Sequence, residues 1–140
     1  MKLTRRNVLV LGSGTFAAAS LTGLPAIAAK VDEMISAVTG GAETGSGDLV
    51  LTAPEIAENG NTVPIEVSAP GAVAVTLYAD GNPVPAVATI KFGPLNASRS
   101  ASTRIRLAKS QNVIAVARME DGSFQRADVP VKVTIGGCGG

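Results

Sequence analysis

The residue in this sequence best suited to chemistry is its single cysteine, Cys138, third from the C-terminus. It stands in the segment Gly136-Gly137-Cys138-Gly139-Gly140, with two glycines on either side. Glycine has no Cβ and leaves the backbone nearly unrestricted, so this segment offers nothing to pack into a core. A cysteine placed there can act as a nucleophile or as a point of covalent attachment through its thiolate. We interpret the segment as a short arm that presents Cys138 to another molecule.

The rest of the sequence supplies no group that would activate this thiol. Positive neighbours and helix N-termini favour the thiolate, but the nearest fixed charge is the C-terminal carboxylate, and Lys132 lies six residues upstream. Histidine is absent, and there is no second cysteine. A Cys–His pair and an internal disulfide are therefore impossible, and a transition-metal site would need carboxylates alone or ligands from another chain. We expect no cofactor and no catalytic residue here, and activation by a partner.

The first 28 residues are predicted to be an export signal. Arg5 and Arg6 precede a mildly apolar stretch from Val8 to Ile27, and Pro25-Ala26-Ile27-Ala28 supplies a small-residue cleavage pattern. This layout is typical of a secretory signal, and the arginine pair indicates the twin-arginine type. An uncleaved membrane anchor is the alternative, since the stretch is just long enough to span a bilayer. We expect cleavage after Ala28, a periplasmic location without membrane attachment, and a partner exported together with the folded chain.

Composition narrows the possible partners of the remaining chain. Without the signal it has the length of one domain and is slightly acidic, because Lys2, Arg5 and Arg6 are removed. Only three aromatic residues remain: Tyr78, Phe92 and Phe124. A nucleic-acid partner is therefore not expected, since it would require a basic domain or face. A lone cysteine in an exported protein implies an intermolecular bond or a reactive thiol.

The elements that must position Cys138 begin with a helix over 30–38, followed by a glycine-rich linker that ends at residue 47. The helix could dock on the domain or on a partner. From residue 48 the pattern changes to short strands, predicted at 49–52, 63–68, 73–78, 89–92, 102–107, 113–119 and 124–135. We therefore divide the chain into the signal at 1–28, helix and linker at 29–47, a β-domain at 48–135 and the arm at 136–140.

Alternating apolar residues define the faces of these strands. The last strand keeps Val129, Val131, Val133 and Ile135 on one face, whereas the stretch from Val113 to Met119 is apolar on both faces. The latter predicts a central strand and could include a subunit contact. Short strands with regularly spaced turns favour an all-β fold, an immunoglobulin-like antiparallel β-sandwich. A β-barrel is the alternative. In either fold the arm leaves directly from the end of a strand.

The length of the arm suggests its use. Three residues from Gly136 to Cys138 reach at most about 10 Å when extended, so the thiol could enter a narrow channel of a second protein while the domain stays outside. Ordering such an arm costs roughly 1–2 kcal/mol per residue. That cost favours weak docking and quick release, which a carrier that visits several enzymes requires.

Taken together, the arginine-pair signal, the all-β domain and the terminal Gly-Gly-Cys-Gly-Gly resemble the SoxY family, the sulfur-carrier subunit of the bacterial Sox thiosulfate-oxidation system. The stretch from Gly47 to Gly60, GDLVLTAPEIAENG, also resembles that family's first strand and turn. The resemblance implies a periplasmic carrier, not an enzyme, that forms a heterodimer with a SoxZ subunit. Cys138 is then the covalent attachment site for sulfur, and Gly136, Gly137, Gly139 and Gly140 form a swinging arm.

The resemblance further implies three transient partners. A haem-containing enzyme joins thiosulfate oxidatively to the cysteine and gives an S-thiosulfonate. A hydrolytic enzyme then releases sulfate, and a third enzyme, where present, oxidises the remaining sulfane sulfur.

Other readings of the same residues stay open. Cys138 could be a disulfide tether of a structural subunit, or the thiol of a reductase or transferase. The terminal Gly139-Gly140 also occurs in ubiquitin-like sulfur carriers, although their activation needs cytoplasmic ATP. Arg104 and Arg106 share a strand face and could attract anions, or could simply be solvated. Glu55 and Glu58 are interpreted as loop surface, since no third metal ligand is evident.

Overall fold

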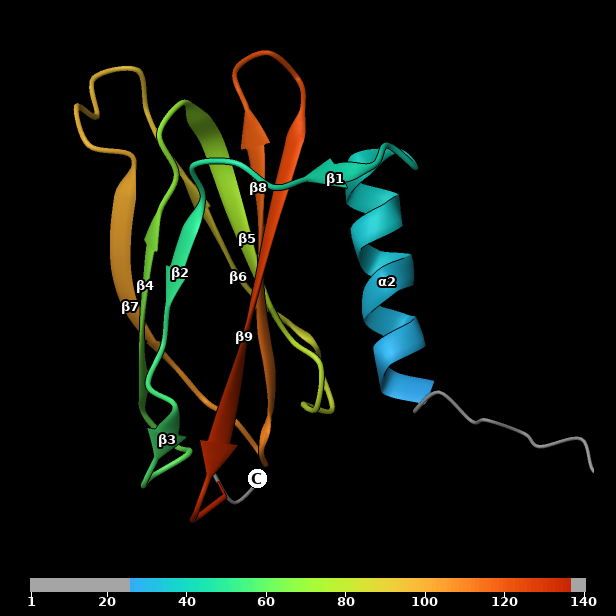
Figure 1. The fold of residues 1–140 in the computed structure, drawn as a ribbon, viewed down its shortest axis with the longest axis vertical. Helices are drawn as coiled ribbons and strands as arrows, with labels where there is room; N and C mark the ends of the chain where they lie inside the picture. The colour runs from blue at the N-terminus through green and yellow to red at the C-terminus, as the bar shows by residue number, and fades with distance from the viewer. Residues whose placement is uncertain (1–25, 137–140) are drawn as a thin grey trace, which may run out of the picture.

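A computed structural model describes the backbone of residues 26–136 and the side chains from residue 29 onward. Two sheets face each other, and a helix lies against the outer side of the larger one (Figure 1). The larger sheet has the strand order β1-β9-β8-β5-β6, with β3 paired to β9, and the smaller has the order β2-β4-β7. The elements are α2 (Ala26–Thr39), β1 (Thr44–Gly45), β2 (Val50–Thr52), β3 (Ile56–Ala57), β4 (Val63–Ser68), β5 (Ala72–Ala79), β6 (Ala86–Lys91), β7 (Ser100–Ile105), β8 (Gln111–Met119) and β9 (Phe124–Val133).

The core between the sheets follows from the period-two alternation of the strands. Successive side chains of a strand point to opposite faces, so each strand contributes every second residue to the interior. The buried set includes Ile65 and Val67 of β4, Val75 and Leu77 of β5, and Val131 of β9. Two separate sheets around one core confirm the immunoglobulin-like sandwich, and the β-barrel alternative is wrong.

Strand β8 is buried on both faces, as its continuous apolar sequence predicts. It pairs antiparallel with β5 on one side and with β9 on the other, and every residue from Val113 to Ala117 is buried. Val113, Ala115 and Ala117 point into the sandwich core. Ile114 and Val116 point to the outer face, where a second apolar cluster lies.

Helix α2 supplies the other half of this second cluster. It is longer than the predicted 30–38, and its residues Val31 and Ile35, spaced four apart, pack on Tyr78, Ile114 and Val116. Residues four apart lie on the same face of a helix, so one stripe of α2 is apolar and buried. The helix therefore docks on its own domain, and the idea that the outer residues of β8 contact a subunit is corrected: α2 covers them.

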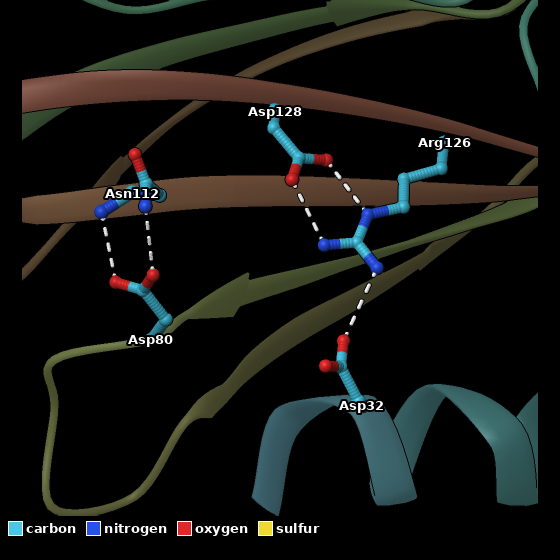
Figure 2. Close-up of polar contacts among 5 residues, drawn as sticks. All are labelled: Asp32, Asp80, Asn112, Arg126 and Asp128. Carbon is cyan, nitrogen blue, oxygen red and sulfur yellow. Dashed lines mark hydrogen bonds and ion pairs between the residues drawn. The ribbon is translucent and has the colours of Figure 1, made fainter. Parts of the chain in front are cut away.

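An arginine joins the helix to the sheet by charge as well. Arg126 of β9 donates hydrogen bonds to both carboxylate oxygens of Asp128, at 2.8 Å each. Its Nη1 also reaches Oδ1 of Asp32 on α2 at 3.3 Å (Figure 2). These acceptors, Asp128 first, raise the pKa of the Arg126 guanidinium further above its ordinary value. The ion pair between Arg126 and Asp32 fixes which side of α2 faces β9.

Two short strands were not predicted. In the segment expected to be a linker, β1 pairs in parallel with the start of β9, placing Thr44 opposite Phe124. In the following loop, β3 pairs in parallel with the end of β9, placing Ala57 opposite Val133. A third difference concerns Ile135, which was expected in the last strand, on the same face as Val131, but lies beyond the end of β9 and is 67% exposed.

A tight turn at Asp121-Gly122, a dipeptide typical of hairpins, joins β8 to β9. Gly122 has a φ of +83°, a conformation that glycine adopts without steric cost, and the Met119 amide donates to the Ser123 carbonyl at 2.9 Å. This turn joins β8 to β9 and therefore sets the register of the strand that carries the arm.

Replacing Ile35 should weaken the docking of α2. Ile35→Ala removes a buried side chain from the helix–sheet cluster, and such changes reduce the free energy of unfolding by about 2–3 kcal/mol. Val38→Ala is the matched control on the same helix, because Val38 is 51% exposed and should change stability by less than about 0.5 kcal/mol. Chemical denaturation measures both. Equal losses for the two variants would contradict this docking.

Alkaline pH should destabilise the fold through Tyr78. Its side chain is 1% exposed beneath α2, and this burial raises the pKa of its hydroxyl. Above about pH 10 the unfolded chain therefore loses this proton before the folded chain does, and stability falls as pH rises. Tyr78→Phe should remove that part of the decline in the free energy of unfolding. Since this is the only tyrosine in the sequence, tyrosinate absorbance follows it directly, and titration at the ordinary pKa would refute the prediction.

Candidate functional site

The predicted site residues fall into two groups. Cys138 lies outside the described residues, as do Gly137, Gly139 and Gly140, so their roles stay predictions. Gly136 is described, and it lies just beyond β9, at the end of the sandwich where β3 also lies (Figure 1). We call the segment from Thr134 to Gly136 the arm root.

One side of the arm root is held by the chain around β3. The Thr134 amide donates to the Ala57 carbonyl at 3.0 Å, and the Ile135 carbonyl accepts from the Gly60 amide at 2.9 Å. The Thr134 hydroxyl also donates to the Glu58 carbonyl at 3.2 Å. The parallel ladder of β3 and β9 is thus continued past the last strand residue. The segment around Glu58 was interpreted as loop surface; its side chain is exposed, but its backbone supports the arm root.

The other side is held by the loop between β7 and β8. The hydroxyl of Ser110 accepts the Val133 amide at 2.8 Å and donates to the Val133 carbonyl at 3.3 Å. The same loop brings the Ala108 carbonyl against Gly136, where an added Cβ would lie 2.6 Å from the Ala108 oxygen. Both edges of the chain leading to Cys138 are therefore occupied.

Asn82 fastens this loop to the turn between β5 and β6. Its Oδ1 accepts the Ala108 amide at 2.9 Å, and its Nδ2 donates to the Arg106 carbonyl at 2.7 Å. Beside it, Asp80 accepts two hydrogen bonds from Asn112, at 2.8 Å from the backbone amide and 2.9 Å from the side chain (Figure 2). The side-chain amides of Asn82 and Asn112 and the Asp80 carboxylate thus tie the β5–β6 turn to the segment that runs from β7 into β8, at the arm end of the sandwich.

The charged residues predicted as candidates surround this end without forming a reaction centre. Arg104 lines a shallow hollow of about 530 Å³ on the outer face of the smaller sheet, together with Glu66 and Ser102. Arg106 is exposed and lies just beyond the end of β7. Neither arginine forms an ion pair with another described residue. The hollow combines both charge signs, which does not favour a purely anionic ligand.

The described part of the chain also offers no metal centre. No three histidine, cysteine, aspartate or glutamate side chains lie close enough together in residues 26–136 to hold an ion. Glu55 and Glu58 are both exposed on either side of β3, and no third ligand joins them. No described helix is long and apolar enough to span a membrane.

The sequence matches the family described as "Sulfur oxidation protein SoxY" over residues 35–138, from the docking helix to the arm cysteine. The chain belongs to the SoxY family. Its structure is similar to that of the sulfur carrier protein SoxY from Chlorobium limicola f. thiosulfatophilum, at 36% sequence identity and a TM-score of 0.66. That match covers 77% of this chain and 99% of the Chlorobium protein. None of the proteins with curated functions matches the sequence.

Two more distant structures resemble this SoxY-family chain in fold only. A superoxide reductase (neelaredoxin) from Ignicoccus hospitalis matches with 20% identity and a TM-score of 0.54, over 63% of this chain and 81% of its own. A putative superoxide reductase from Thermotoga maritima matches with 17% identity and a TM-score of 0.51, over 64% and 93%. These likenesses confirm the sandwich and carry no chemistry to this chain.

The sequence predicted the arm but did not reveal what supports its root. Neither Asn82 nor Ser110 was singled out, because nothing in a local pattern reveals a partner 23 to 26 positions away. The one available clue was the density of side chains able to hydrogen-bond at Asp80–Asn82 and at Ser110–Asn112, two segments that the fold brings together.

Removing the Ser110 hydroxyl should loosen the arm root. Ser110→Ala leaves the Val133 amide without its 2.8 Å acceptor, which should lower the free energy of unfolding by about 1 kcal/mol. It should also speed hydrogen exchange of the Val133 amide. Ser98→Ala is the control, because the Ser98 hydroxyl bonds only to the neighbouring Ser100 hydroxyl in an exposed loop. Unchanged exchange at Val133 in Ser110→Ala would show that this bond does not hold the strand end.

Proposed function

We propose that this chain is a periplasmic sulfur carrier that holds thiosulfate-derived sulfur covalently on Cys138 and presents it to partner enzymes. The observation that carries the proposal is the terminal Gly-Gly-Cys-Gly-Gly of a SoxY-family chain. The arm root at the end of the sandwich supports it, because a thiol two residues beyond Gly136 can protrude from the domain rather than fold back into its core.

The proposed loading step forms a disulfide-type bond between two sulfurs. The thiol of Cys138 and the outer sulfur of thiosulfate are joined, the thiol releases one proton, and two electrons pass to a haem-containing partner. The product is a cysteine S-thiosulfonate. Because the nearest positively charged residue along the sequence is Lys132, six residues before Cys138, the thiol is a weak nucleophile on its own, and the partner must supply the activation.

The proposed unloading step is hydrolysis. Water attacks the sulfone sulfur of the S-thiosulfonate in a second partner enzyme, the S–S bond to that sulfur breaks, and sulfate and two protons leave. A persulfide remains on Cys138. A third enzyme, where present, would oxidise this sulfane sulfur. The carrier itself needs no acid or base in these steps, since each partner brings its own.

The proposal includes a heterodimer with a SoxZ-type subunit, and export of the folded chain by the twin-arginine route. Covalent transport on an arm explains why a chain without histidine and with one cysteine belongs to a sulfur-oxidation family. The competing function is a structural subunit in which Cys138 forms a permanent disulfide to another chain. An exported lone cysteine is compatible with that function too.

Intact-mass measurement distinguishes these two functions. The wild-type chain purified from the periplasm should show reductant-labile additions equal to thiosulfonate or to extra sulfur atoms, because the bond to Cys138 is an S–S bond. Cys138→Ser should show none of them. Supplying thiosulfate with the partner enzymes should increase the loaded fraction.

The control is Ser98→Ala, an exposed hydroxyl far along the chain from the arm, which should load like the wild type. If the only species is a constant protein–protein disulfide, or a free thiol inert to thiosulfate and its enzymes, the carrier function is refuted and the tether is favoured.

A further inference from the structure

Gly136 was predicted to be part of a freely moving arm, but its surroundings give a different reason for a glycine. Its φ is not in the left-handed region, which among the described glycines is confined to residues 40, 41, 71 and 122. This position therefore does not require the backbone freedom of glycine. It requires the absence of a side chain, because an added Cβ would lie 2.6 Å from the Ala108 carbonyl oxygen, a distance that real Cβ atoms essentially never show.

The Ala108 carbonyl cannot easily move away, because it belongs to a fastened backbone. The Ala108 amide donates to Asn82 at 2.9 Å, and the preceding Leu107 is fully buried. The Leu107 amide in turn donates to the Gly60 carbonyl at 2.7 Å. Asn82 is itself held, since Nε2 of Gln111 donates to the same Oδ1 at 2.9 Å. A clash at residue 136 would therefore have to be relieved by the arm root and not by the loop.

The arm root is fastened by the same residues. Gly60 uses its carbonyl to bind the Leu107 amide and its amide to bind the Ile135 carbonyl at 2.9 Å. Gly60 thus links the arm root to the loop that carries Ala108. The segment 134–136 lies between the β3 backbone and the Ala108 carbonyl, and its direction is set before the chain reaches Cys138.

We propose that Gly136 is the fixed root of the sulfur-carrying arm and that Asn82 is a positioning residue, acting through Ala108 to set the direction in which the arm leaves the domain. This inference rests on the proposed carrier function. It shortens the part of the chain that is predicted to swing, because the two residue steps from Gly136 to Cys138 span at most about 7 Å. A partner enzyme must then bring its reacting atoms within that distance of the root.

The test compares Gly136→Ala with Gly93→Ala. A Cβ at Gly93 meets nothing within 4 Å, and its φ is not in the left-handed region, so this variant should behave as the wild type. In Gly136→Ala the added methyl should push the root off the Ala108 carbonyl. Loading of Cys138 by the partner enzyme, with thiosulfate as the substrate, should fall about tenfold or more in kcat/KM, because small misplacements of a reacting group carry such costs. Alkylation of the thiol by iodoacetamide, which needs no docking, should be unchanged.

Asn82 is tested by two variants. Asn82→Ala removes the acceptor for the Ala108 amide and the donor to the Arg106 carbonyl, so it should reproduce the loss in kcat/KM with unchanged alkylation. Asn82→Asp keeps an acceptor for Ala108 and should recover part of the loss. If Asn82 were needed only for stability, its replacement would lower the melting temperature and slow loading in proportion to the unfolded fraction. Asn82→Asp would then show no such recovery.

Hydrogen exchange supplies a readout that needs no partner. The Gly60 amide, bonded to Ile135, should exchange about tenfold faster in Gly136→Ala than in Gly93→Ala. If exchange is unchanged, or if exchange changes while loading stays at the wild-type rate, the root assignment is overturned. If the wild-type chain itself accepts no sulfur from thiosulfate and the partner enzymes, the carrier function fails, and the exchange comparison still decides whether Gly136 is fixed.

Discussion

The pairing of β9 on both of its edges is the constraint on which the rest of the structure depends. One edge is bonded to β8 from Phe124 to Val131, while the other receives β1 at its start and β3 at its end. An edge strand with free amides and carbonyls invites pairing with other chains, and here two short segments cover the two ends of that edge. Since the predicted arm continues from β9, the strand that leads to Cys138 is bonded to β8 along one edge and held at both ends of the other.

The same strand connects the helix to the sandwich. Arg126 lies on the outer face of β9, where it binds Asp128 on its own strand and Asp32 on α2. Exposed ion pairs contribute little to stability, and this one supplements the apolar contact of Val31 and Ile35. The ion pair between Arg126 and Asp32 therefore fixes the orientation of α2 more than it adds to the free energy of unfolding. Helix α2 thus covers the outer face of the larger sheet over Tyr78, Ile114 and Val116, whereas the outer face of the smaller sheet is exposed and carries both charge signs.

Periodicity predicted the parts of the fold whose order is local. Strands β4, β7 and β8 have long alternating or continuous apolar patterns, and each was placed within a few residues of its bounds. The two-residue strands β1 and β3 have no period to detect, because what makes them strands is the partner β9 and not their own sequence. Ile135 shows the same limit in reverse: it continues the alternation of β9, but the strand has already ended, so the pattern assigns it to a core that is no longer beside it. The thiol and its glycines were visible from composition, whereas Asn82 became recognisable only once the loops had been brought together.

The support beneath the arm also changes the energetics expected of a carrier. Ordering one residue on binding costs roughly 1–2 kcal/mol, and Thr134 and Ile135 are already held by hydrogen bonds to Ala57, Glu58 and Gly60. A partner that receives the thiol would therefore not have to order this segment. Fewer ordered residues mean that less binding energy is consumed when the arm enters a site, so a small contact area suffices for docking. A carrier that must leave each enzyme again benefits from such a contact, because release is fast when few interactions have to be broken.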